Sequence, residues 1–417
     1  MKRTEIMQEI RKMRFLEVFQ GWNEGRLTQS EAARILGVCG RTFRRYLSRH
    51  GENGMDGLLD KRLSQPSHRK APVDEAMKVV STYRQIYDGW NVKHFHAWYR
   101  REHGGGRSYS WVKKTLQANG AVTRAPKRGA HRKKRESSPL PGMMIHQDGS
   151  SHEWVAGVQW DLIVTMDDAT NEHYSTFFVE EEGTWSSFRG VEELIAKRGL
   201  FCSLYTDRGG HYWNTPEAGG KVDKVNLTQF GRGMKQLGVE MIPAYSPEAR
   251  GRSERAFRTH QGRLPQELAL AGIVDMASAN RYLSQTYMPA FNAEFSHPAM
   301  EKGSAFVPWV GGPLEDILCE TFERTVGSDN CVRFEGLILQ IPQDRHRMHY
   351  VKAKVTVRRH KDGGVSVSHG PRKLASFDAN GKETKNKGKA AALVRARGLA
   401  GKAVTGYALH AFPRENQ

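Results

Sequence analysis

Cysteine, acidic residues and long apolar runs are all scarce in this sequence. Its 417 residues include four cysteines, no two of which form a Cys-x-x-Cys pair, so we expect a reducing compartment and no disulfide framework. No apolar run reaches the length of a membrane span, and residues 1–20 are charged throughout, unlike a signal peptide. We therefore expect a cytoplasmic protein that makes no membrane contact.

The shortage of acidic residues leaves a large excess of positive charge. Lysine and arginine number 64 against 45 aspartates and glutamates, which gives a formal net charge of +19 at pH 7. Because the basic residues recur along the whole chain, a polyanion is the expected partner, and nucleic acid fits better than a membrane surface. A chain of this length is expected to fold as about two to four domains.

A helix-turn-helix unit is predicted over residues 1–60. Thr28-Gln-Ser-Glu31 is a capping box that begins a short helix, and Gly37 then turns the chain into a basic helix from about residue 39. Phe43 and Leu47 are expected to pack inward. Four polar side chains are then left to enter a DNA major groove: Arg41, Thr42, Arg44 and Arg45. The alternative is a plain helical hairpin with a solvated basic face.

A second helix-turn-helix unit is predicted over residues 72–120. Ser110 is expected to cap its last helix, from which Lys113 and Lys114 would contact DNA. Residues 121–140 are basic, contain prolines and have few apolar side chains, so we expect an extended linker that follows DNA phosphates. The densest basic run of this linker is Arg132, Lys133, Lys134 and Arg135.

The composition becomes globular from residue 141. Over residues 141–300, apolar strands come first and helices then alternate with strands, which is the pattern of a mixed α/β domain. Two aspartates follow predicted strands: Asp148 comes after Met143–His146, and Asp207 comes after Leu200–Tyr205.

Residues 325–380 are predicted to form a small β-barrel. Short runs of strand composition recur here, and Asp362-Gly363-Gly364 between two of them is a hairpin signal. Residues 381–417 form a basic tail. The predicted fold class is therefore multidomain, with an all-α helix-turn-helix N-terminal region, an α/β core and a small C-terminal β-barrel.

A third carboxylate is expected on a helix that follows the strands. Ser246 followed by Pro247 predicts a helix start, with Glu254 two turns further along. Arg250 and Arg258 lie four residues to either side of Glu254, so a surface ion pair is one interpretation. In the other, three carboxylates from two strands and a helix hold a pair of divalent metals: Asp148, Asp207 and Glu254. Mg²⁺ suits such a site because it prefers carboxylate oxygens.

The strings around these carboxylates are similar to those of a known superfamily. Fifty-eight residues lie between Asp148 and Asp207, and 46 lie between Asp207 and Glu254. Asp148-Gly-Ser, Tyr205-Thr-Asp207-Arg-Gly-Gly and Ser246-Pro-Glu-Ala-Arg-Gly-Arg-Ser-Glu254 resemble the three acidic motifs of the DDE transposase and retroviral-type integrase superfamily, whose core is RNase H-like. With its paired helix-turn-helix units and C-terminal barrel, the chain resembles bacterial insertion-sequence transposases of the ISNCY type.

The resemblance implies that Asp148, Asp207 and Glu254 are catalytic ligands of two Mg²⁺ ions, for which Mn²⁺ would substitute. It implies a DNA transposase that binds element ends, frees a 3′-hydroxyl by hydrolysis and joins that hydroxyl to target DNA. Arg258 stands where many members keep a lysine that touches DNA, and Arg250 is expected to contact DNA as well. A homo-oligomer assembled on DNA, in the nucleoid of a bacterial cell, is also implied.

One departure from the superfamily is the long spacing before the third carboxylate. We expect the extra length to lie in a polar loop, Tyr212–Val225. Glu248 would shorten the spacing to 40 residues and is the alternative ligand. Glu254 is preferred because the superfamily places its glutamate just after the glycine of such a string, and the helix dipole alone favours Glu248. Asp167 and Asp168 are expected to form a turn, with a role near the site left open.

Three other functions share parts of this evidence. An RNase H-like nuclease or resolvase would use the same carboxylates without joining strands. A helix-turn-helix DNA-binding regulator would carry an inactive core. An RNA-binding module would use the β-barrel and the basic tail.

Overall fold

The computed structural model describes residues 3–59, 71–124, 136–217, 220–245 and 251–384. Two compact units are present, one of residues 1–88 and 106–124 and the other of residues 89–105 and 125–417. Several residues singled out above lie outside the described ranges: Arg132, Lys133, Lys134, Arg135, Ser246, Pro247, Glu248, Arg250 and the tail from residue 385. Of the helices that are described, none is both long and apolar enough to cross a membrane.

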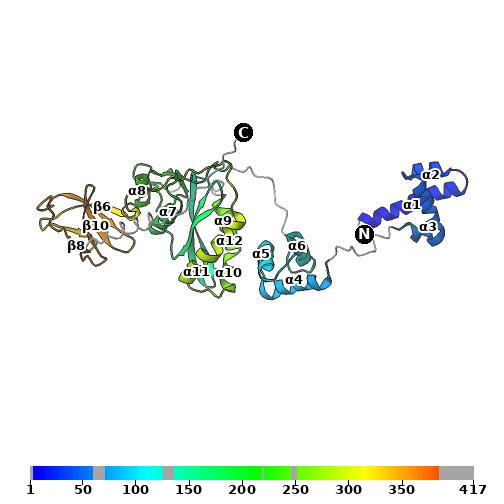
Figure 1. Ribbon diagram of the computed structural model, residues 1–417, viewed down its shortest axis with the longest axis horizontal. Coiled ribbons are helices and arrows are strands. Elements are labelled where there is room, and N and C mark those ends of the chain that lie inside the picture. The colour runs from blue at the N-terminus through cyan, green and yellow to red at the C-terminus, as the bar shows by residue number, and fades with distance from the viewer. Residues whose placement is uncertain (1–2, 60–70, 125–135, 218–219, 246–250, 385–417) are drawn as a thin grey trace, which may run out of the picture. The chain divides into compact units, whose positions relative to one another are not determined.

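The first unit is helical. Its elements are α1 (Arg3–Asn23), α2 (Gln29–Ile35), α3 (Gly40–Asn53), the 3-10 helix η1 (Gly54–Leu58), α4 (Val73–Ile86) and α6 (Tyr109–Ala118), as Figure 1 shows. The predicted helical N-terminal region is therefore confirmed. The cap of α6 differs from the prediction, because the helix begins at Tyr109 and the side chain of Ser108, instead of Ser110, accepts the amide of Trp111.

The turn between α2 and α3 forms as its sequence predicts. The Thr28 hydroxyl accepts the amide of Glu31, and the Glu31 carboxylate accepts the amide of Thr28 at 2.8 Å, which completes the capping box. Gly37 has a φ of +68°, a conformation that glycine adopts without strain. Phe43 of α3 is fully buried in a cluster with Phe15 of α1.

A five-stranded mixed sheet forms the centre of the second unit. Its strands are β1 (Met144–Val155), β2 (Val158–Asp167), β3 (His173–Val179), β4 (Ser203–Thr206) and β5 (Glu240–Pro243), in the spatial order β3-β2-β1-β4-β5. The first three form an antiparallel meander, whereas β4 and β5 run parallel to β1. The mixed α/β core predicted from the sequence is confirmed.

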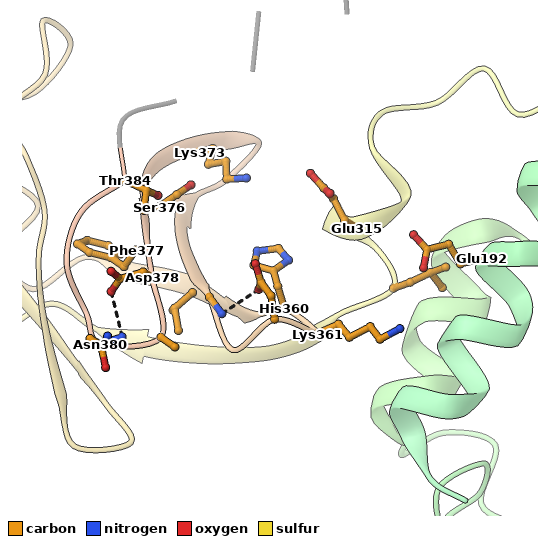
Figure 2. Close-up of a pocket in the computed structure, with 15 residues that line it drawn as sticks. Glu192, Glu315, His360, Lys361, Lys373, Ser376, Phe377, Asp378, Asn380 and Thr384 are labelled. Carbon is orange, nitrogen blue, oxygen red and sulfur yellow. Dashed lines mark hydrogen bonds between the residues drawn. The ribbon is translucent and has the colours of Figure 1, made fainter. Parts of the chain in front are cut away.

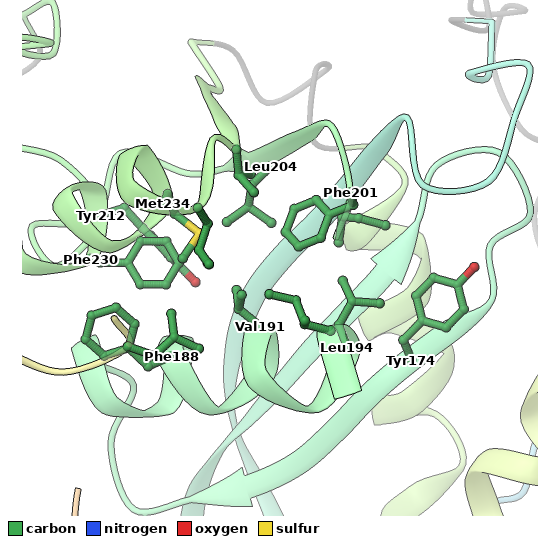
Figure 3. Packing of buried hydrophobic residues seen from close by; sticks show 14 of the residues in the cluster. Tyr174, Phe188, Val191, Leu194, Phe201, Leu204, Tyr212, Phe230 and Met234 are labelled. Atoms are coloured by element: carbon green, nitrogen blue, oxygen red, sulfur yellow. The ribbon is translucent and has the colours of Figure 1, made fainter. Parts of the chain in front are cut away.

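Helices cover both faces of this sheet (Figure 1). One face packs on α7 (Thr184–Arg198) and α8 (Gln229–Leu237), and the other packs on α9 (Ser253–Gln261), α10 (Leu264–Leu270), α11 (Met276–Tyr282), the π-helix η4 (Leu283–Tyr287) and α12 (Met288–Phe295). Figure 3 shows the first core, where Phe188 and Val191 of α7 meet Phe230 and Met234 of α8. Burial of these side chains holds the sheet between two helical layers.

One helix that the sequence assigned to the second helix-turn-helix lies within the second unit. This helix is α5 (Val92–Glu102). His94, which is fully buried, has its Nε2 2.6 Å from Oε1 of Glu267 on α10. Lys93 forms an ion pair with Glu294 of α12 at 3.3 Å. The contacts of α5 within this unit are therefore partly polar.

The C-terminal strands form two sheets. After η5 (Leu314–Asp316), the strands β6 (Glu320–Thr325), β9 (Lys354–Arg359), β10 (Val365–His369) and β11 (Arg372–Phe377) pair in the order β11-β10-β9-β6, while β7 (Cys331–Phe334) and β8 (Leu337–Gln340) form a separate hairpin. A shared apolar cluster joins them, with Val332 and Leu339 of the hairpin against Val357 and Val367. The predicted barrel is not confirmed, because within residues 251–384 no pairing closes either sheet.

Candidate catalytic site

Asp148 lies inside β1, and the prediction that it ends a short strand is wrong. The polar residues that follow it continue to pair with β2, with Asp148 opposite Val164, so β1 extends to Val155. Side chains alternate between the faces of a strand, so Asp148 shares a face with His146 and Ser150. This is the face covered by α9. Asp148 is only 6% exposed.

Asp207 comes just after the strand that pairs with β1 in parallel. The parallel pairing of β1 with β4 ends where His146 lies opposite Tyr205, and each aspartate comes two residues further along the chain. Asp207 directly follows β4, and its Oδ1 accepts the amide of Gly209 at 2.9 Å. The charges of both aspartates act on one buried hydroxyl, that of Tyr212, so the two carboxylates lie in the same region of the core.

Tyr212 lies next to this pair and was missed by the sequence reasoning. Its hydroxyl is 3.3 Å from Oε1 of Gln147 and 3.3 Å from Oε1 of Glu182. Burial raises the pKa of Tyr212 well above its ordinary value, and the charges of Glu182, Asp148 and Asp207 add to the effect, so the hydroxyl keeps its proton. The predicted polar loop is thus wrong at its start, where Tyr212 packs against Phe230 in the core (Figure 3).

Glu182 is a fourth carboxylate near the aspartate pair. Its carboxylate lies against Gly149, in the space that a Cβ at this position would occupy. Its backbone amide donates to Asp161 at 2.7 Å, and Nε2 of His211 is 3.5 Å from its Oε1. The glycine directly after Asp148 was the available sequence signal for this close approach.

Glu254 lies in the first turn of α9 and is exposed. The prediction placed it two turns into a helix from Ser246, but the helix described here begins at Ser253. Gly251, a poor helix former, precedes that start. At the other end of α9, Nε2 of Gln261 donates to Oγ of Ser150 at 3.0 Å. Because seven residues make two helical turns, Glu254 lies on the same flank of α9 as Gln261.

A buried carboxylate meets the residue just before α9. Oδ1 of Asp168 is 2.7 Å from Nε2 of His146 and 2.9 Å from Nε of Arg252. Burial by itself raises the pKa of Asp168, but hydrogen bonds from His146 and Ser138, with the charge of Arg252, hold it well below its ordinary value. Asp168 is therefore ionised in the folded protein.

Asp167 has a different environment from its neighbour. It is fully buried, and its carboxylate accepts the amides of Ala169 and Gly142 at 3.1 and 3.2 Å. Burial raises the pKa of Asp167 to about 6. The turn expected after β2 is present, with Asn171 at a φ of +58°. Asp167 is the last residue of β2, and Asp168 is the first residue of this turn.

The predicted DNA-contacting side chains that the structure describes are mostly exposed. On α3, Phe43 is buried and Leu47 is partly buried, while the outward side chains are Arg41, Arg44 and Arg45, with Thr42 half-buried. On α6, Lys114 is exposed and Lys113 is partly buried. Arg258 is exposed on α9, one turn after Glu254.

The three predicted ligands are not gathered into one metal cluster. In the ranges that the structure describes, no three side chains of histidine, cysteine, aspartate or glutamate are grouped closely enough to hold an ion. Asp148 lies in β1, Asp207 follows the strand that pairs with β1, and Glu254 lies on α9, which contacts β1 through Gln261. All three donors are carboxylates, which is the donor chemistry that Mg²⁺ requires.

A separate hollow of about 810 Å³ lies between α7 and the C-terminal sheet (Figure 2). Glu192 and Glu315 line it together with Lys361 and Lys373, so acidic and basic side chains are mixed in its wall. None of the three predicted ligands lines this hollow. It is therefore not the site expected from the sequence.

No protein-family model matches the chain. The protein named "Putative transposase y4bF" from Sinorhizobium fredii is 28% identical over 371 residues, which cover 87% of this chain and 79% of that protein. "Transposase for insertion sequence IS1202" from Streptococcus pneumoniae is 27% identical over 237 residues, or 56% of this chain and 50% of that protein. These similarities confirm the predicted resemblance to bacterial transposases.

Two solved structures show a looser likeness. A chain of a simian T-cell lymphotropic virus intasome has a TM-score of 0.32 and 12% identity, covering 68% of this chain and 93% of that chain. A chain of a pre-cleavage Mos1 transpososome has a TM-score of 0.28 and 13% identity, covering 68% and 92%. Scores of this size add nothing to the similarity in sequence.

Proposed function

We propose that this chain, a relative of bacterial transposases over most of its length, is a DDE-type transposase that cleaves DNA at element ends and joins the freed strand to target DNA. The observation that carries the proposal is the pairing of β1, which contains Asp148, with β4, which Asp207 directly follows. Glu254 is the third member, on the helix that covers the same face. The mixed sheet with helices on both faces is consistent with an RNase H-like core.

The aspartate pair supports a role in metal binding. Two carboxylates on neighbouring strands repel each other, and a divalent cation between them relieves that repulsion. Asp148, Asp207 and Glu254 would hold two Mg²⁺ ions, with Mn²⁺ as a substitute. Bound Mg²⁺ would activate the attacking oxygen and stabilise the leaving oxygen of a phosphodiester.

The reaction consists of two displacements at phosphorus. Water attacks a phosphodiester at the element end, the bond to the 3′-oxygen breaks, and that oxygen leaves as a 3′-hydroxyl. The new hydroxyl then attacks a target phosphodiester, forms a bond to phosphorus and displaces a second 3′-oxygen. No covalent bond between protein and DNA is needed in either step.

The basic side chains would hold the DNA during these steps. Arg41, Arg44 and Arg45 on α3 are exposed as a helix that reads a major groove requires. Arg258 would contact DNA beside Glu254, and Lys113 and Lys114 would do so from α6. The linker of residues 121–140 would follow phosphates and give affinity without sequence preference. The active form would be a homo-oligomer assembled on DNA.

The test is incubation of the purified protein with labelled end DNA, a target plasmid and Mg²⁺. A transposase gives a nicked end with a 3′-hydroxyl and a joined product. Nicking without joining would favour the RNase H-like nuclease or resolvase, and specific binding without nicking would favour the regulator. Excess chelator should stop both steps, and Ca²⁺ should support little chemistry because its coordination is longer and looser.

A further inference from the structure

Asp168 joins three segments of the core at one buried carboxylate. Its Oδ1 receives His146 from β1 at 2.7 Å and Arg252, the residue before α9, at 2.9 Å. Its Oδ2 accepts the amide and the hydroxyl of Ser138 at 2.7 and 3.0 Å. Both carboxylate oxygens thus accept hydrogen bonds, and Asp168 itself is fully buried.

Arg252 is held by more than the charge of Asp168. Its guanidinium also donates to the carbonyl oxygen of Asp168 at 2.8 Å and to Oγ of Ser137 at 2.7 Å, and its side chain is 9% exposed. A guanidinium has a planar set of donors, so several simultaneous hydrogen bonds fix both its position and its orientation. Glu254 follows only two residues later.

The contacts of α9 with β1 flank Asp148. His146, two residues before Asp148, reaches α9 through Asp168 and Arg252, and Ser150, two residues after it, accepts the Gln261 side chain at 3.0 Å. Arg252 and Gln261 in turn flank Glu254. The two tethers differ in strength, because one is a buried network with charged members and the other is a single neutral hydrogen bond.

We infer that Asp168 and Arg252 are positioning residues that set the start of α9 against β1, and thereby the distance from Glu254 to Asp148. This inference rests on the proposed function for the role of Glu254. The anchor itself holds α9 whichever reaction the core performs. Asp168 thus has a role beyond the turn predicted from the sequence.

The test uses the full chain and Mn²⁺ as a probe, with binding followed by electron paramagnetic resonance in the absence of DNA. Arg252→Gln removes a positive charge near the site, so simple electrostatics predicts tighter binding of the cation. Loss of positioning predicts weaker binding, by about tenfold to a hundredfold, which is the usual effect of removing a residue that supports a metal ligand. Tighter or unchanged binding by Arg252→Gln would overturn the inference.

A second measurement separates positioning from a general loss of stability. Hydrogen exchange of the first turn of α9 should become faster in both Arg252→Gln and Asp168→Asn. Arg263→Gln is the matched control, because it breaks another ion pair of this unit, with Glu294 at 2.7 Å, and should leave Mn²⁺ binding unchanged. Equal weakening in this control would also overturn the inference, since it would reduce the effect to stability.

The same measurements test the proposed metal site separately from the anchor of α9. If the wild-type chain binds no Mn²⁺, or if Asp148→Asn binds it equally well, the metal site fails, and the exchange of α9 alone decides the anchor. Unchanged exchange at Ser253–Gln261 in both variants would then refute the anchor too. Faster exchange confined to this helix would support it.

Discussion

Two short basic helices, α3 and α9, are anchored in opposite ways. Each buries a phenylalanine, Phe43 in α3 and Phe257 in α9. Neither helix has a side-chain cap at its start, which is Cys39 for α3 and Arg252 for α9, and the arginines of α3 are exposed. The residue before α9, Arg252, is bound within the core by the fully buried Asp168.

The difference follows from what each helix has to do under the proposed function. Side chains that read a groove adjust to the bases, so exposure and freedom of the arginines on α3 are useful. A carboxylate that shares a metal with two aspartates has to be held within a fraction of an ångström. Apolar burial holds a helix against a sheet but leaves it room to slide, and a buried charged network removes that freedom.

The largest expected effect is at the carboxylates. Asp148→Asn, Asp207→Asn and Glu254→Gln should each lower cleavage and joining by more than about a thousandfold, since each removes charge from a site that acts electrostatically. Binding of end DNA should survive, because it is assigned to α3. Gel assays of nicked and joined products would measure the first, and fluorescence anisotropy the second. An active Glu254→Gln would shift the third role to Glu248.

The next effect compares the two buried phenylalanines. Phe43→Ala should cost about 3–5 kcal/mol of local stability, because it leaves a cavity among aromatic rings. Hydrogen exchange should then rise across α1, α2 and α3 and end binding should weaken, with the core unaffected. Phe257→Ala should instead speed exchange in the layer of α9–α12 and lower cleavage. Identical patterns of hydrogen exchange in the two variants would contradict the prediction that α3 and α9 are stabilised by separate cores.

A smaller effect is expected on the pH dependence of stability, through Asp167, which precedes Asp168 in the chain. Burial raises the pKa of Asp167 from 3.8 to about 6. Between about pH 4 and pH 6 the folded state therefore holds a proton on Asp167 that the unfolded state has released. The stability that this proton provides is lost as the pH rises above about 6. Asp167→Asn removes this loss. Its gain in unfolding free energy should be about 2–3 kcal/mol larger at pH 7 than at pH 4.

Urea denaturation at the two pH values would measure this difference. Gly142 donates to Oδ2 of Asp167 and Ala169 donates to Oδ1, so asparagine keeps one of these hydrogen bonds and loses the other. That loss is the same at both pH values and cancels in the comparison. An equal gain at both pH values would mean that Asp167 is not protonated by its burial.

The smallest effect is expected on α3. Arg44→Ala should cost about 1–3 kcal/mol of discrimination between end DNA and random DNA if Arg44 contacts a base edge. If it contacts a phosphate, the loss should be equal for both DNAs and the salt dependence should flatten. Anisotropy titrations at several salt concentrations would distinguish these results. Arg26→Ala, which breaks the ion pair with Glu24 outside α3, should leave discrimination unchanged.

The sequence predicted what local patterns determine. The capping box at Thr28, the turn at Gly37 and the burial of Phe43 follow from neighbouring residues, and each is present. The strand before Asp207 was also expected, because a largely apolar run is a local signal. Recurrent strand-like runs predicted most of the C-terminal strands. The pairing of those strands depends on distant partners, so the runs did not predict whether the sheet closes into a barrel.

Tertiary contacts explain what the sequence did not show. Polar residues after Asp148 belong to β1 because β2 pairs with them, and nothing in their own composition indicates this. Tyr212 is buried because Phe230 packs against it from a helix that begins 17 residues later. The partnership of Asp168 with Arg252 joins residues 84 positions apart, a separation at which one sequence gives no pairing signal.

The strand order has a consequence for how the protein is made. β1 pairs on one edge with β2, which follows it at once, and on the other with β4, which is not synthesised until residue 203. Contacts between near neighbours form fastest, and chains fold from the N-terminus as they are translated. The β1–β3 meander and the helices α1–α3 are therefore able to form while Asp207 and Glu254 are still missing. A nascent chain therefore acquires the helices that we propose to read DNA before it has any complete set of the proposed catalytic carboxylates.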